Sequence, residues 1–221
     1  MLLNTCDKMN ILMTTAIIRG IMQAIQARYE FRAFAQHFGP AEEKMRRLAQ
    51  FEKFRESSEI YLLSAANDAY NIKIRYETLD IKVLVSEKQG LQQWQPQMKA
   101  GFPVKKAVIR EQIFPAFDVA APEFKRPEYS LTQFIQDIIE AHPALSIARV
   151  DKRRFGYTVD GCIGEIAELI INGAAIKTIA VESLDVQAVL QAKKILGLQE
   201  YENVSYLLAI KRILGMAPLP K

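Results

Sequence analysis

Apolar and polar residues alternate most regularly in the stretch NIKIRYETLDIKVLV. Successive side chains of a strand point to opposite faces, so this alternation predicts strands at residues 71–76 and 79–85 around a tight turn. In that hairpin Lys73 and Arg75 lie on the same face as Lys82, with apolar residues behind them. The surroundings of this basic face therefore decide what the hairpin does.

The same alternation predicts further strands of an antiparallel sheet. They lie at about residues 28–34, 59–64, 91–98, 147–159, 162–171 and 174–182. Pro96 places one of them at an edge or a bulge. Asn172-Gly173 is a strong hairpin signal, and pairing counted from it sets Glu165 opposite Ala180 and on the same face as Glu182.

Helical spacing of apolar residues predicts four helices, at about residues 40–54, 130–142, 183–197 and 203–214. Ser130 and Gln133 have the spacing of a capping box, Ser183 is the expected N-cap of the third helix, and Gly197 is its stop. Residues 103–114 could form a strand or a helix, and a helix is favoured. The proline-rich stretch 115–129 is an irregular connection inside the domain. Together the elements predict an α+β fold.

Two architectures are compatible with these faces. Periodicity alone favours an open sheet with helices on one side and solvated charges on the other. The signs of the charges favour a closed or nearly closed sheet, because a solvated face mixes signs more freely. The basic residues are Arg32, Lys73, Arg75, Lys82, Lys152 and Arg154, and the few acids are mainly Glu30, Asp80, Glu165 and Glu182. Curling the sheet would gather these groups around a cavity that suits a chain of phosphates and, at one side, a hard divalent cation.

The composition is that of an ordinary globular chain. Its 221 residues are 50% hydrophobic and 24% charged, which is enough apolar content for a core. The net charge of +4 permits an anionic partner but does not by itself indicate nucleic acid. Cys6 and Cys162 indicate neither a zinc site nor a disulfide framework and fit a reducing cytoplasm. His37 and His142 form no catalytic or metal pattern, and the sequence has no Gly-rich phosphate loop.

Residues 1–26 are apolar but do not fit a membrane anchor. The run MNILMTTAII is too short to cross a bilayer, Arg19 interrupts it, and no clear small-residue cleavage site follows. We expect a peripheral helix or a start placed too early. One domain is expected at residues 27–215, with a short tail at residues 216–221.

The order of these motifs resembles the CYTH superfamily of triphosphate tunnel enzymes. The resemblance rests on YNIKIR, LDIK, KRRFGYTV, GEIAELII, IAVES and YENVSY and covers about residues 28–214. It implies an antiparallel tunnel of about eight strands with helices on the outside. Basic side chains of such a tunnel hold a triphosphate group, and glutamates hold Mg²⁺ or Mn²⁺.

The resemblance also assigns roles to single residues. Arg32, Lys73, Arg75, Lys82, Lys99, Lys152 and Arg154 would bind the phosphates, and of these Lys73, Arg75, Lys82, Lys152 and Arg154 would be the catalytic clamp. Glu30, Glu165 and Glu182 would hold the metal. The chain departs from the family pattern at Arg28 and Ala180, where the family has glutamates, so the metal site is weaker than the basic site.

Two functions follow from the resemblance. The first is a metal-dependent phosphohydrolase that acts on a triphosphate or on inorganic polyphosphate. The alternative is a catalytically reduced module that binds polyphosphate or a nucleotide without turnover. Either would be cytoplasmic, with a small phosphorylated partner and no membrane or nucleic acid, and a homo-oligomer is compatible with both.

Overall fold

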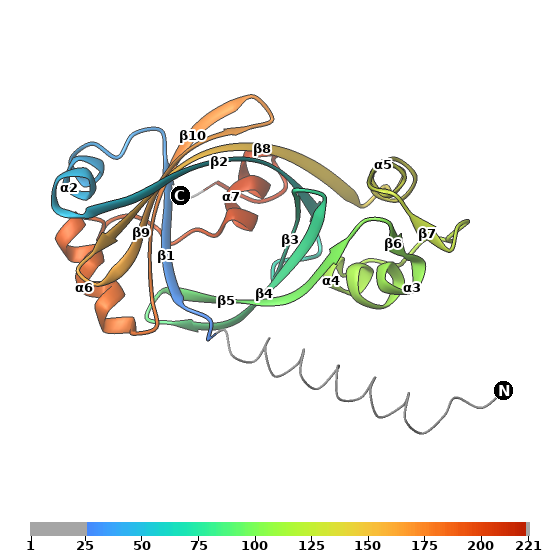
Figure 1. The fold of residues 1–221 in the computed structure, drawn as a ribbon, viewed down its shortest axis with the longest axis horizontal. Helices are drawn as coiled ribbons and strands as arrows, with labels where there is room; N and C mark the ends of the chain where they lie inside the picture. The colour runs from blue at the N-terminus through green and yellow to red at the C-terminus, as the bar shows by residue number, and fades with distance from the viewer. Residues whose placement is uncertain (1–25, 220–221) are drawn as a thin grey trace, which may run out of the picture.

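The centre of the protein is a closed antiparallel barrel of eight strands, seen in the computed structural model that describes residues 26–219 (Figure 1). Around the barrel the strands follow the order β1-β10-β9-β8-β2-β3-β4-β5, and β5 pairs back with β1. They are β1 (Tyr29–Ala35), β2 (Gln50–Ser64), β3 (Tyr70–Arg75), β4 (Thr78–Lys88), β5 (Leu91–Gly101), β8 (Leu145–Val159), β9 (Cys162–Ile171) and β10 (Ala174–Ser183). The closed α+β fold is confirmed, and it is the architecture that the resemblance to the CYTH superfamily implies.

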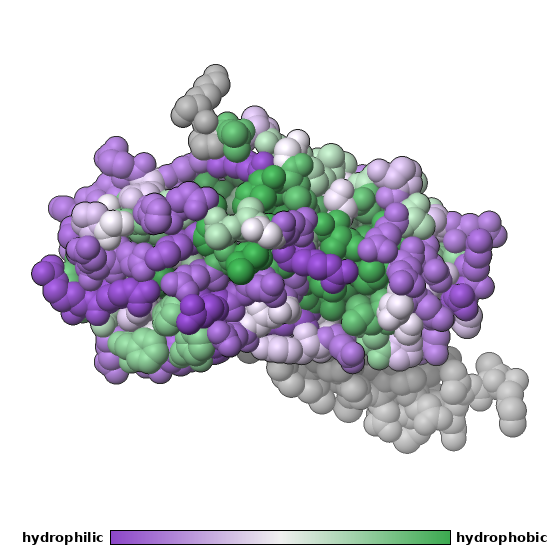
Figure 2. Space-filling model, turned by 90° about the horizontal axis from the view of Figure 1, so that it is seen from above, coloured by the Kyte–Doolittle hydropathy of each residue, from purple (hydrophilic) through white to green (hydrophobic). Residues whose placement is uncertain are grey.

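Helices pack on the outside of the barrel at both ends of its long direction. One group consists of α2 (Pro40–Leu48) and α6 (Val186–Leu196). The other consists of α3 (Lys106–Val108), η1 (Ile109–Ile113), α4 (Phe114–Phe117), α5 (Leu131–Gln133) and η2 (Phe134–Ile139), with the short strands β6 (Val104–Lys105) and β7 (Glu128–Tyr129). Seen from above the view of Figure 1, apolar residues gather along the middle of the surface and polar residues at the ends (Figure 2).

Three apolar clusters hold these parts together. Phe31 and Ile179 on the outer face of the barrel pack with α2 and α6, and Ile72 and Ile81 pack with the second helical group. The third cluster lies on the inner face, where Leu207 and Ile210 of α7 (Tyr206–Ile213) pack against inward residues such as Tyr61, Ala148 and Ala167. Helix α7 therefore closes one end of the barrel, and the polar inner face remains beside it.

The local signals in the sequence are mostly confirmed. Asn172 and Gly173 have φ values of 46° and 89°, and the pairing sets Glu165 opposite Ala180, as expected from the hairpin. Ser130 and Gln133 form the capping box, and Gly197 ends α6 in the left-handed conformation. Pro96 lies at a register shift between β4 and β5.

Some boundaries differ from the prediction. The helix expected at residues 40–54 ends at Leu48, because Phe51 and Phe54 pack across the sheet on Tyr157 and Phe155 rather than on one helix face. The strand expected at residues 59–64 is thus only the second half of β2. Asp185 rather than Ser183 caps α6, since β10 continues through Ser183.

The expectation of a peripheral N-terminal helix or an early start falls on residues 1–25, which lie outside the described residues. Residues 220–221 of the expected tail lie outside them as well. No helix between residues 26 and 219 has the length and apolar character needed to cross a membrane.

Candidate functional site

The inner faces of the strands enclose a cavity of about 220 Å³, which we call the tunnel cavity. Charged side chains dominate its lining, seven basic and four acidic. The basic ones are Arg32, Arg55, Lys73, Arg75, Lys82, Lys152 and Arg154, and the acidic ones are Glu30, Asp80, Glu165 and Glu182. Asn71, Tyr61 and Trp94 of the strands and Ser205 and Tyr206 at the start of α7 complete the lining.

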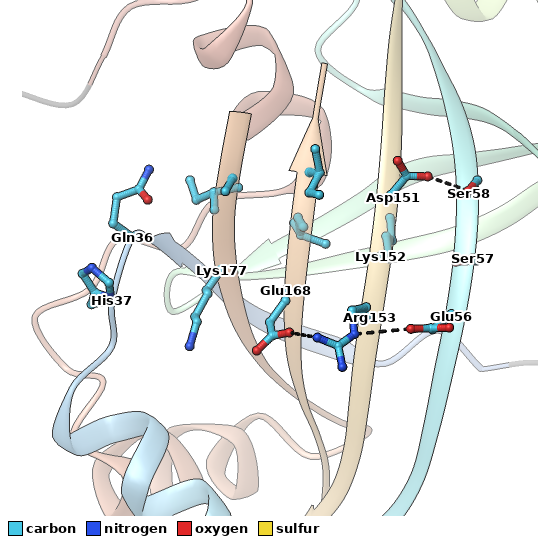
Figure 3. Close-up of a pocket in the computed structure, with 14 residues that line it drawn as sticks. Gln36, His37, Glu56, Ser57, Ser58, Asp151, Lys152, Arg153, Glu168 and Lys177 are labelled. Carbon is cyan, nitrogen blue, oxygen red and sulfur yellow. Dashed lines mark hydrogen bonds and ion pairs between the residues drawn. The ribbon is translucent and has the colours of Figure 1, made fainter. Parts of the chain in front are cut away.

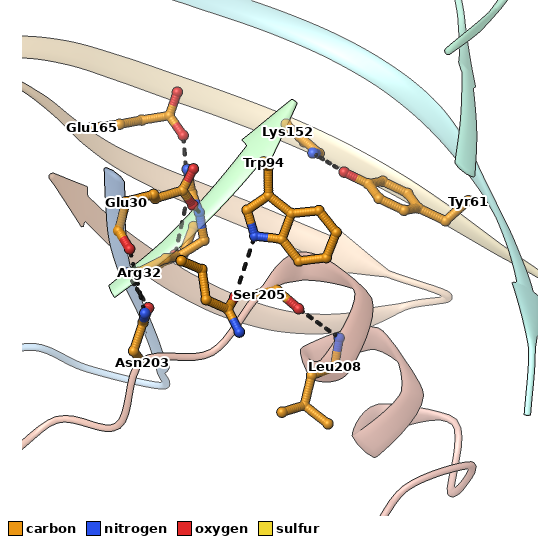
Figure 4. Close-up of polar contacts among 11 residues, drawn as sticks. Glu30, Arg32, Tyr61, Trp94, Lys152, Glu165, Asn203, Ser205 and Leu208 are labelled. Atoms are coloured by element: carbon orange, nitrogen blue, oxygen red, sulfur yellow. Dashed lines mark hydrogen bonds and ion pairs between the residues drawn. The ribbon is translucent and has the colours of Figure 1, made fainter. Parts of the chain in front are cut away.

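Glu59 on β2 holds three of the basic side chains together. Its side chain is fully buried, and its carboxylate oxygens lie 2.9 Å from Lys152 Nζ, 3.0 Å from Lys73 Nζ and 3.5 Å from Arg75 Nη1. Strand register explains this contact, because Arg75 is the cross-strand partner of Glu59 between β2 and β3. Lys152 Nζ also donates a hydrogen bond of 2.7 Å to the Tyr61 hydroxyl (Figure 4).

These contacts change the protonation of the cluster. Burial opposes the ionised form of Glu59, but Lys152 and Lys73 outweigh it and lower the pKa of Glu59 to about 2. Burial is also the largest effect on Lys152; together with the charge of Lys73 it exceeds the attraction of Glu59 and lowers the pKa of Lys152 to about 7. Glu59 is therefore ionised at neutral pH, whereas Lys152 gains or loses its proton near pH 7.

Arg32 on β1 joins two carboxylates of the cavity. Its Nε lies 2.5 Å from Glu30 Oε1 and its Nη1 lies 3.2 Å from Glu165 Oε1 (Figure 4). The guanidinium carbon lies 4.7 Å from the centre of the Tyr206 ring. Burial disfavours the charge, but Glu30, Tyr206 and Glu165 outweigh it and raise the pKa of Arg32 well above its ordinary value. Arg32 is a permanent cation held between two carboxylates.

Asn203 fixes the backbone of β1 at this point. Its Oδ1 accepts a hydrogen bond of 2.8 Å from the Arg32 amide, and its Nδ2 donates to the carbonyls of Glu30 and Gly90. The Val204 amide donates to the Arg32 carbonyl at 2.7 Å. β1 pairs with β5 only over Tyr29 and Glu30. The segment around Asn203 therefore supplies the hydrogen-bond partners that β5 does not give to the backbone of Arg32.

Three further cations line the cavity without a carboxylate partner. Arg55, Lys82 and Arg154 form no ion pair among residues 26–219, and Arg55 is the direct cross-strand partner of Arg154 between β2 and β8. Arg154 Nε is buried and has no hydrogen-bond partner in the described part of the chain. Buried polar atoms of Asn71, Asp80 and Tyr206 share this condition and line the same cavity. Buried polar atoms without a hydrogen-bond partner are rare in folded proteins, and these four all line the tunnel cavity.

The three carboxylates expected to hold Mg²⁺ or Mn²⁺ share the cavity but do not fit a ready metal site. Glu30 and Glu182 are cross-strand partners, and burial together with Glu30 raises the pKa of Glu182 to about 7. Glu30 and Glu165, however, are both engaged by Arg32. Within residues 26–219 no three side chains of His, Cys, Asp and Glu are grouped so that they could hold a metal ion.

A second, larger hollow lies on the outer face of β2, β8, β9 and β10. Its volume is about 730 Å³, but each lysine and arginine side chain of its lining already has a carboxylate partner, Arg153 within the hollow and Lys152 and Lys177 outside it at Glu59 and Glu42. Figure 3 shows Arg153 between Glu56 and Glu168, at 3.3 Å and 2.9 Å, and Ser58 beside Asp151. This hollow therefore presents no excess of positive charge, unlike the tunnel cavity.

The structure brings most of the residues named from the sequence into one cavity. Of the seven basic residues expected to bind phosphate, only Lys99 does not line it; Lys99 pairs with Asp80 across β4 and β5, but its side chain is exposed. Glu59, Arg55 and Tyr206 were not expected. Glu59 lies on the same face as Tyr61 in the predicted strand, which was a usable signal. Arg55 fell between the expected helix and the expected strand, so no face could be assigned to it.

Comparisons with known proteins give likenesses of structure only. No family model matches the chain, and no curated protein matches it in sequence. HpAC1 from Hippeastrum, a candidate adenylyl cyclase with a dominant triphosphatase activity, has a TM-score of 0.49 and 14% identity over 87% of this chain and 98% of its own. The PH1012 protein of Pyrococcus horikoshii OT3 has a TM-score of 0.48 and 14% identity over 81% and 97%. A candidate adenylate cyclase from Bacillus halodurans has a TM-score of 0.43 and 10% identity over 89% and 95%.

Proposed function

We propose that the tunnel cavity binds the phosphate chain of a triphosphate or of inorganic polyphosphate. The observation that carries this proposal is the pair Arg55 and Arg154, two like charges directly opposite each other on the inner face. Like charges in this position destabilise a sheet unless an anion lies near both. Arginine is also the side chain whose planar fork best matches phosphate oxygens.

The size and the charge of the cavity support the same ligand. At about 220 Å³, the cavity is smaller than the roughly 300–1,000 Å³ of sites for drug-sized molecules, and a short anionic chain suits it better. Lys82 and Arg154 lack ion pairs in the described part, so their charge is available to a ligand. The Glu59 cluster adds Lys73 and Lys152, whose charge Glu59 offsets only in part.

Hydrolysis of the bound chain with Mg²⁺ or Mn²⁺ is the second candidate function. It is favoured by Glu30 and Glu182, two inward carboxylates opposite each other, since carboxylate oxygens are the ligands these metals prefer. The first candidate does not need this pair, and the engagement of Glu30 by Arg32 weighs against the second.

Calorimetric titration with inorganic triphosphate tests the first candidate, and release of orthophosphate in the presence of Mn²⁺ or Mg²⁺ tests the second. We expect one triphosphate to bind per chain, because residues 26–219 enclose one cavity with this charged lining. Binding without release of orthophosphate supports a binding module. Release that requires the metal and is lost in Glu182→Gln supports the phosphohydrolase, and absence of binding contradicts both.

Triphosphate binding at pH 8 should be accompanied by uptake of close to one proton by Lys152. With a pKa of about 7, Lys152 is only about one-tenth protonated at pH 8, and a neighbouring polyanion favours its charged form. The terminal phosphate groups of the ligand also titrate near this pH, so the contribution of Lys152 is the difference between the unchanged protein and a variant that lacks this amine. Calorimetry in buffers of different ionisation enthalpy measures the protons.

The matched variant for this prediction is Lys152→Met, which keeps the length of the side chain and removes the titrating group. It should bind triphosphate more weakly and take up close to one proton less than the unchanged protein, because Glu182, whose pKa is also about 7, still titrates in the same cavity. The same proton uptake in the variant and in the unchanged protein would rule out Lys152 as the group that titrates.

A further inference from the structure

We propose that the Arg32 guanidinium takes the place of a divalent cation in the tunnel cavity, so that the ligand binds without metal. The inference rests on the proposed function only for the identity of the ligand as a phosphate chain. Its own basis is the arrangement of Arg32 between Glu30 and Glu165 (Figure 4).

Arg32 uses the oxygens that a metal would need. Its Nε contacts Glu30 Oε1, and its Nη1 contacts Glu165 Oε1 at 3.2 Å and lies 3.4 Å from Thr178 Oγ1. One positive group thus bridges two carboxylates from different strands, which is the task expected of Mg²⁺ or Mn²⁺ at this end of the cavity. A metal bound to the same oxygens would lie within a few ångströms of the guanidinium, where like charges repel strongly.

Arg32 is also not free to move aside. The residue is only 5% exposed, and the ring of Tyr206 covers its guanidinium at 4.7 Å. Its amide and carbonyl are held by Asn203 and Val204. Displacing Arg32 would leave a buried cation without partners, and this penalty opposes metal binding.

The bridge changes what a phosphate ligand meets in the cavity. Glu30 and Glu165 are compensated by Arg32, so they repel an anion less than free carboxylates would. The remaining cations, among them Lys82 and Arg154, can then contact phosphate oxygens directly. A metal is not needed to bring the anion into a site that contains carboxylates.

Calorimetric titration with Mn²⁺ alone tests this role of Arg32 independently of any phosphate ligand. The unchanged protein should not bind Mn²⁺ measurably. Arg32→Met, which removes the guanidinium but keeps an apolar side chain of similar length, should bind Mn²⁺ at least about tenfold more tightly. Arg32→Met with Glu165→Gln should lose this gain, and Arg32→Lys, which retains a cation, should behave like the unchanged protein.

Triphosphate titrations with EDTA and with Mn²⁺ complete the test. Binding by the unchanged protein in EDTA is expected. Tight binding of Mn²⁺ by the unchanged protein, or triphosphate binding only when Mn²⁺ is present, would overturn the inference even if Arg32→Met does not fold. Failure to bind triphosphate under any condition would instead contradict the proposed function. The Mn²⁺ titrations would still test whether Arg32 excludes a metal ion.

Discussion

Replacement of Glu59 by glutamine should destabilise the protein by about 3–5 kcal/mol, because it leaves the buried Lys152 and the partly buried Lys73 and Arg75 without their common carboxylate. Glu59 contacts Lys73, Lys152 and Arg75, and its side chain is fully buried. Glutamine preserves the shape and can still form hydrogen bonds, so the loss reports mainly the charge. Urea unfolding at pH 7, with the slope checked for two-state behaviour, measures the change.

Glu56→Gln provides the matched control on the same strand. Glu56 also pairs with an arginine, Arg153 at 3.3 Å, but its side chain is 62% exposed on the outer face. An exposed pair of this kind contributes about 0–1 kcal/mol. Equal losses in the two variants would mean that Glu59 does not organise the inner cluster.

The same contact has a pH signature. The pKa of Glu59 is lowered from 4.5 to about 2 in the folded protein, which corresponds to about 3 kcal/mol of stability. Since the folded-state pKa lies below the unfolded one, this stability is present above pH 4.5 and is lost as the pH falls towards 2. The stability of Glu59→Gln should therefore change less over this pH range than that of the unchanged protein.

Replacement of Arg154 by alanine should weaken triphosphate binding roughly 10- to 150-fold, the equivalent of one charged hydrogen bond of about 1.5–3 kcal/mol. Arg154 lines the tunnel cavity, and its buried Nε has no partner among the described residues. Because it forms no ion pair there, its removal leaves no carboxylate uncompensated. We expect the stability to stay the same or to rise, since repulsion from Arg55 disappears.

Arg153→Ala is the neighbouring control. Successive residues of a strand point to opposite faces, and Arg153 lies on the outside, 58% exposed and paired with Glu56 and Glu168. Its removal should change triphosphate affinity by less than about twofold. Equal effects of the two substitutions would place the ligand outside the tunnel cavity.

Local patterns in the sequence were sufficient to assign the faces of most strands. Alternation set Lys73 and Arg75 on one face, and the Asn172-Gly173 turn fixed the register that brings Glu165 and Glu182 together. Period-2 alternation and two-residue turns act over a few residues, so they can be read without knowing the rest of the fold.

The parts of the site that were missed depend on contacts between distant segments. Glu59 meets Lys152 only because β2 pairs with β8, and no short turn fixes that register. Arg55 was hidden because Phe51 and Phe54 suggested a longer helix, whereas they pack on rings of β8. Tyr206 reaches the cavity because α7 closes the barrel from inside, which periodicity cannot reveal.

The ion pairs of Arg32 also could not be predicted from the sequence. Alternation placed Glu30 and Arg32 on one face, but two residues on one face can share a bound metal or bind each other. The distances in the folded chain decide this, since Arg32 contacts both Glu30 and Glu165.

Phosphate binding by the inner face of the barrel is tested most directly by calorimetric titration of the unchanged protein with inorganic triphosphate in EDTA at neutral pH and low salt. The titration should show saturable binding of one triphosphate per chain, weakened by added salt because the contacts are between charges. If the unfolding curve shows that the protein is folded, absence of saturable binding under these conditions would contradict the claim that the inner face of the barrel is a phosphate site.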